Sequence, residues 1–73
     1  MILDALRKKY EAEIASAKAN IDVYNRNPAG IGEHPDLVQA VDTEMVKLAD
    51  AEDKLNTLNK HYGNQPEQPD LLT

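Results

Sequence analysis

The chain has 73 residues, 41% of them hydrophobic, and its 13 acidic and 8 basic residues give a formal net charge of −5. It is long enough for one domain at most, and because it contains no cysteine it has neither disulfides nor thiolate metal sites. Its apolar runs are too short for a transmembrane helix or a signal peptide, so we expect a cytoplasmic protein without membrane contact.

Residues 2–26 are predicted to form the first helix. This stretch lacks Gly and Pro and is rich in Ala, Glu and Lys, which favour helix. Its apolar residues recur every three or four positions, the spacing of a helix and not of a strand, and they form the first predicted core stripe: Leu3, Leu6, Tyr10, Ile14, Ala17, Ile21 and Tyr24. Because proline disfavours helical dihedrals in the residue before it, Asn27–Pro28 should end the helix near Arg26.

Residues 27–34 are predicted to form a loop that reverses the chain direction. Asn27, Pro28 and Gly30 stand at the positions where a type I turn prefers these residue types. Ile31 lies between two glycines, where it either covers the end of the helical core or is displayed for recognition.

A second helix is predicted over residues 35–62. It begins either with Pro35 in its first turn or with Asp36 as its cap, since Gln39 follows Asp36 by three residues. Its core stripe repeats the three- and four-residue steps and ends with Tyr62: Leu37, Val41, Met45, Leu48, Ala51, Leu55 and Leu58. Gly63 stands where a C-terminal cap is expected.

The two stripes predict an all-α fold, an antiparallel two-helix hairpin spanning residues 1–63. In such a hairpin large residues would face small ones, with Met45 opposite Ala17 and Tyr10 opposite Ala51. Residues 64–73 form a Pro-containing acidic tail that is expected to be disordered or extended. Leu71 and Leu72 at its end could be a docking peptide or a strap on the hairpin itself.

A hairpin of this size buries too little apolar surface to offset the conformational entropy lost on folding. We therefore expect self-association, as a homodimer that forms a four-helix bundle or as a higher oligomer. Alanines outside the main stripe of the first helix, such as Ala12 and Ala19, would let another helix approach closely, although alanine also simply favours helix.

Chemistry beyond protein–protein contact has little support in the sequence. The hydroxyl residues have no nearby His in the sequence and the carboxylates are spread around the helices, so we expect no enzyme, no cofactor and no catalytic residues. The one possible metal cluster, Glu33, His34 and Asp36, has too few ligands and is better explained by acids favoured at a helix start. A small helical nucleic-acid binder remains an alternative, but the net negative charge argues against it. The interaction candidates are Ile31, Glu33, His34, Asp36, Leu71 and Leu72.

The segment NPAGIGEHPD at positions 27–36, between the helical segments KYEAEIA and KLADAEDKL, resembles small uncharacterised helical proteins of T4-like marine cyanophages. The resemblance would cover nearly the whole chain, and its distinctive part is this ten-residue loop. It implies a viral protein that acts in an infected host cell or in the virion, with a host or virion protein as a possible partner. The resemblance implies no activity. The two stripes, which are too small to be stable alone, predict a non-enzymatic helical interaction or structural module, and the alternative is a phage-encoded regulator that binds and modulates a host protein.

Overall fold

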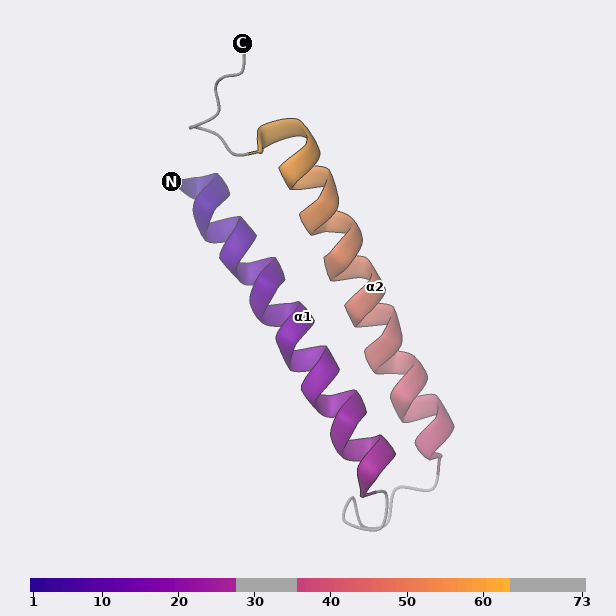
Figure 1. The fold of residues 1–73 in the computed structure, drawn as a ribbon. Coiled ribbons are helices and arrows are strands. Elements are labelled where there is room, and N and C mark those ends of the chain that lie inside the picture. The colour runs from indigo at the N-terminus through magenta and orange to yellow at the C-terminus, as the bar shows by residue number, and fades with distance from the viewer. Residues whose placement is uncertain (28–35, 64–73) are drawn as a thin grey trace.

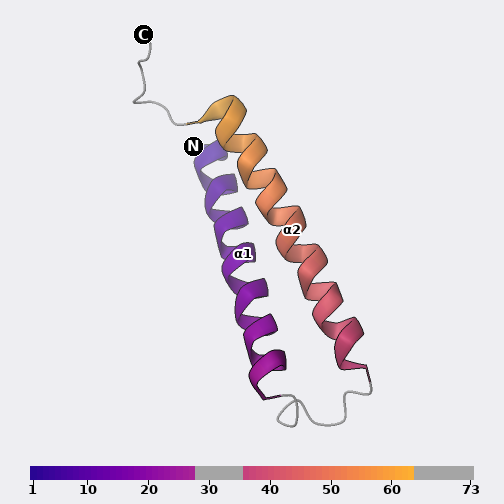
Figure 2. The same ribbon diagram turned by 45° about the vertical axis from the view of Figure 1, so that its right-hand side comes forward.

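The computed structural model describes residues 1–27 and 36–63, which contain two helices and no strand. Helix α1 spans Ile2–Arg26 and helix α2 spans Leu37–Tyr62. They lie side by side and run in opposite directions (Figures 1 and 2), and α1 begins beside the end of α2. The predicted all-α antiparallel hairpin is thus confirmed. Each helix is about 38 Å long at 1.5 Å per residue, so the pair forms a rod.

Helix α1 ends where the sequence predicts. Asn27 has φ −144° and ψ 65°, outside the helical region, and its backbone N–H donates the last bond of the helix to the carbonyl of Val23 at 2.9 Å. The position of Asn27 immediately before Pro28 explains this conformation, because the proline ring clashes with a helical residue before it.

Helix α2 begins at Leu37, two residues after the predicted start at Pro35. Asp36 is its N-cap, and one oxygen of the Asp36 side chain accepts a hydrogen bond from the backbone N–H of Gln39 at 2.9 Å. The Gln39 side chain donates to Thr43, so only the Asp36 half of the expected capping box is formed. At the other end, a Cβ added to Gly63 would overlap the carbonyl oxygen of Asn59, which explains why glycine fits the C-cap.

The core between the helices is thin. Among the described residues, the buried hydrophobic side chains are Ala17, Ala51 and Leu58. Most of the other predicted core positions are half-buried: Leu6, Tyr10, Ile14, Ile21, Tyr24, Leu37, Val41, Leu48 and Leu55. Two helices therefore cover only part of each other's apolar stripe.

Three residues of the predicted stripes are exposed in the hairpin: Leu3, Met45 and Tyr62, which is 63% exposed at the end of α2. Met45 is 46% exposed, because the line of α2 that faces α1 consists of Glu44, Ala51 and Leu58 at seven-residue intervals. Met45 follows Glu44 by one residue and is turned away from α1 by about 100°. Leu3 is 38% exposed in the first full turn of α1.

Candidate interaction surface

An apolar groove lies where the helices approach the loop. It has a volume of about 530 Å³ and is lined chiefly by apolar side chains from both helices: Tyr24, Asn25, Leu37, Val38, Val41, Asp42 and Met45. Val38 is 83% exposed, so this surface is open to solvent. We call it the Met45 groove.

A polar layer crosses the hairpin on the other flank, where its middle third meets the third nearest the loop. Glu44 is buried although it is charged, and its carboxylate is held from both sides. The Asn20 side-chain amide donates to Oε1 at 3.0 Å, and the Lys47 ammonium lies 3.2 Å from Oε2. Asn20 belongs to α1, so this hydrogen bond ties the two helices together. A buried carboxylate without these partners would be strongly destabilising.

The hydrogen bond from Asn20 is the main reason why the pKa of Glu44 lies below its ordinary value, and Lys47 lowers this pKa further. Desolvation opposes both effects without overcoming them. Glu44 is therefore ionised at neutral pH and is a weaker base than an ordinary glutamate. It is suited to holding the helices in place and poorly suited to accepting a proton.

The groove around Glu44 is lined with charges that are already paired. It has a volume of about 360 Å³, and its lining includes Glu13 and Asp50. Lys9 pairs with Glu13 at 2.6 Å, and Lys54 pairs with Asp50 at 3.1 Å. The Asp50 carboxylate also raises the pKa of Lys54. Since these acidic side chains already have a cation beside them, this flank offers no unbalanced charge to a ligand.

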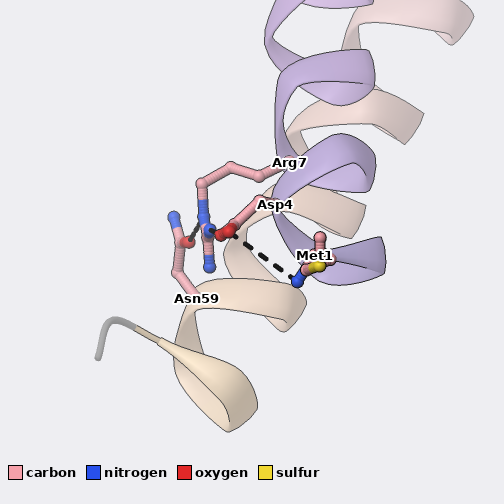
Figure 3. Close-up of polar contacts among 4 residues, drawn as sticks. All are labelled: Met1, Asp4, Arg7 and Asn59. Atoms are coloured by element: carbon pink, nitrogen blue, oxygen red, sulfur yellow. Dashed lines mark hydrogen bonds and ion pairs between the residues drawn. The ribbon is translucent and has the colours of Figure 1, made fainter. Parts of the chain in front are cut away.

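A second polar link closes the end of the hairpin where the chain begins (Figure 3). The Arg7 Nε donates to the side-chain oxygen of Asn59 at 3.0 Å, across the two helices. The same guanidinium donates to Asp4 at 3.2 Å, and the amino terminus of Met1 lies 3.8 Å from the Asp4 carboxylate. Next to this link, a smaller groove of about 260 Å³ includes Leu3, Leu6, Tyr10, Leu58 and Tyr62 in its lining.

Charge is distributed unequally along the rod. The third nearest the amino terminus, residues 1–10 and 54–63, has five basic residues and one acidic residue. The middle third, residues 11–19 and 45–53, has two basic and five acidic residues. The third nearest the loop, residues 20–27 and 36–44, has one basic and four acidic residues. The described hairpin thus has a basic end and an acidic remainder.

Most of the interaction candidates taken from the sequence lie outside the described residues: Ile31, Glu33, His34, Leu71 and Leu72. The prediction of a disordered or extended tail falls on residues 64–73, which also lie outside them. Asp36 is described, and its side chain caps α2. Within ranges 1–27 and 36–63, no group of three or more His, Asp or Glu side chains could hold a metal ion.

Sequence periodicity missed the polar layer and the link between Arg7 and Asn59. Periodicity alone assigns charged residues to solvent, and Glu44 is therefore absent from the predicted core stripe. The available indication was the seven-residue spacing of Glu44, Ala51 and Leu58, which puts Glu44 in line with two apolar residues.

No protein-family model, curated protein or solved structure matches this chain. Neither of the two described helices is long and apolar enough to span a membrane.

Proposed function

We propose that this protein is a non-enzymatic helical module that acts through protein–protein contacts, and that its first partner is a second copy of itself. The observation that carries the proposal is the exposure of large hydrophobic side chains along a hairpin with a very small core. Val38 is 83% exposed, Tyr62 is 63% exposed and Met45 is 46% exposed. Leu58 is the only large hydrophobic residue that is buried among the residues described.

Self-association into a four-helix bundle would correct this imbalance. Each buried aliphatic or aromatic side chain contributes about 1.5 to 3 kcal/mol relative to an exposed one. Ala17 and Ala51 are too small to contribute this much, so a lone hairpin gains little from its core. Packing two hairpins together would bury the half-exposed stripes of both copies.

The groove around Glu44 supports a non-enzymatic function. Its most buried titratable group, Glu44, is held as a carboxylate by Asn20 and Lys47. The groove also contains Ser16, but none of its other lining residues is a His that could activate the hydroxyl.

The concentration dependence of thermal unfolding, followed by circular dichroism, tests self-association. For a protein that folds as an oligomer, dilution lowers the midpoint temperature by mass action. We expect the midpoint to rise steadily with protein concentration across the micromolar range. A midpoint that is independent of concentration, in a single cooperative transition, would contradict the proposal.

A phage-encoded regulator of a host protein is the second candidate function. The loop resemblance to cyanophage proteins favours it, as do the acidic middle and loop-end thirds, which suit a basic partner surface. Affinity capture from cyanobacterial lysate, compared with capture from purified virions, separates the two settings. A stoichiometric host protein supports the regulator, whereas recovery of virion proteins alone supports a structural part.

A further inference from the structure

We propose that the second copy docks on one particular flank of the hairpin, with its long axis antiparallel to the first. The inference rests on the proposed self-association and adds the face and the alignment to it. The docking flank, as we define it, consists of two residues of α1 and three of α2: Ile14, Ile21, Val41, Met45 and Leu48.

Helix geometry places these residues on one flank. Asn25 lines the Met45 groove from α1, and Ile21 and Ile14 precede it by about one and three turns. Val41, Met45 and Leu48 follow one another at steps of four and three along α2, so they share an edge of that helix. Met45 is exposed and the other four are half-buried, so each has apolar surface left to cover.

The opposite flank is a poor docking surface. It presents the polar layer of Asn20, Glu44 and Lys47, followed by the ion pair of Asp50 and Lys54. Covering these groups would remove water from charges that already have partners, and desolvation of this kind costs more than the pairing returns. The five residues of the docking flank are all apolar, so covering their side chains removes water from no charged group of their own.

The charge distribution selects a second copy in antiparallel alignment. In this alignment the basic third of each copy, with five basic residues and one acidic residue, lies beside the acidic loop-end third of the other. A parallel alignment would place the two basic ends together and the two acidic ends together. Opposite charges on facing surfaces fix the orientation of partners, and a two-fold axis brings the same flank of both copies into contact.

A pair of adjacent substitutions tests the flank. Met45→Glu adds a carboxylate to the docking flank, whereas Val46→Glu adds the same charge to the next residue of α2, which is 62% exposed and does not line the Met45 groove. Sedimentation equilibrium should show that Met45→Glu weakens the dimer by about tenfold or more, and that Val46→Glu leaves it nearly unchanged. Circular dichroism establishes how much of each variant is folded.

Equal dimer constants for the two variants would reject the docking flank while leaving self-association intact. A wild-type chain that stays monomeric would reject both proposals. If Met45→Glu does not fold, the alignment experiment below decides, because its variants keep the docking flank intact.

Spin labels on single introduced cysteines test the alignment, since the chain has no cysteine of its own. Asn25 lies eleven residues from the middle of α1, so antiparallel copies would place two labels at Asn25→Cys about 33 Å apart along the rod. A parallel pair would bring them within about 20 Å, twice the distance between packed helices. Labels at Ala49→Cys, near the middle of α2 and one turn after Met45, should be close together. Close Asn25 labels would overturn the antiparallel alignment, and distant Ala49 labels would overturn the docking flank.

Discussion

Removal of the amide that holds Glu44 should measurably weaken the hairpin. In Asn20→Ala the Glu44 carboxylate keeps Lys47 but loses its partner on α1. A hydrogen bond to a charged group contributes about 1.5 to 3 kcal/mol. Asn20 is exposed and the Glu44 side chain retains 11% exposure, which places the expected loss at the lower end, about 1.5 kcal/mol.

Helix propensity raises the stability of Asn20→Ala, which opposes the loss of the hydrogen bond, so its contribution has to be subtracted with a control variant. Replacing Asn by Ala in a helix gains about 0.6 kcal/mol. Asn56→Ala is the matched control, because Asn56 is an exposed asparagine in the interior of α2. We therefore expect the free energy of unfolding of Asn20→Ala to lie about 1.5 kcal/mol below that of Asn56→Ala.

Urea unfolding at one fixed protein concentration, followed by circular dichroism, gives both free energies. Adding Glu44→Ala to each variant completes a double-mutant cycle, in which Asn20→Ala should then cost nothing beyond its control. Equal stability of Asn20→Ala and Asn56→Ala in the wild-type background would refute the idea that the polar layer holds the helices together.

Three further changes have defined expectations. Because the pKa of Glu44 is lowered in the folded hairpin, the ionised carboxylate adds stability at neutral pH; this stability is retained down to about pH 4.5 and is lost as the pH falls through the pKa of the folded state. In urea unfolding, the stability advantage of wild type over Glu44→Gln should therefore shrink as the pH falls below about 4.5. An advantage that stays constant over this range would contradict the expectation. Leu58→Ala should cost about 2 to 5 kcal/mol, whereas exposed Glu52→Ala should stay within about 0.5 kcal/mol, and equal melting temperatures would show that the core is misassigned. Asp36→Ala should lower the free energy of unfolding by about 1 kcal/mol through loss of the N-cap. A urea unfolding curve indistinguishable from that of wild type would show that the Asp36 cap does not stabilise α2.

The sequence predicts the helices well because their causes are local. Three- and four-residue steps of apolar side chains define each helix, and Asn27 before Pro28 ends α1 through a clash between neighbouring residues. The choice between Pro35 and Asp36 at the start of α2 depended on which residue supplies the cap. The structure assigns that function to Asp36.

The inner face of the hairpin is harder to predict because it depends on both helices together. Glu44 can point inward only because Asn20 of α1 stands opposite it and Lys47 lies one turn further along α2. The spacing of apolar residues within α2 alone cannot indicate a partner on α1. Met45 was predicted to face Ala17, but with Glu44 directed inward it is turned toward the open flank.

Sedimentation equilibrium of the full chain at micromolar concentration is the most direct test of self-association. If two hairpins pack on their docking flanks, we expect a species of twice the chain mass of 8.1 kDa, which dissociates to monomer on dilution. A single species of 8.1 kDa that remains helical and melts cooperatively would show that the thin core formed by Ala17, Ala51 and Leu58 is sufficient by itself, and would contradict the claim.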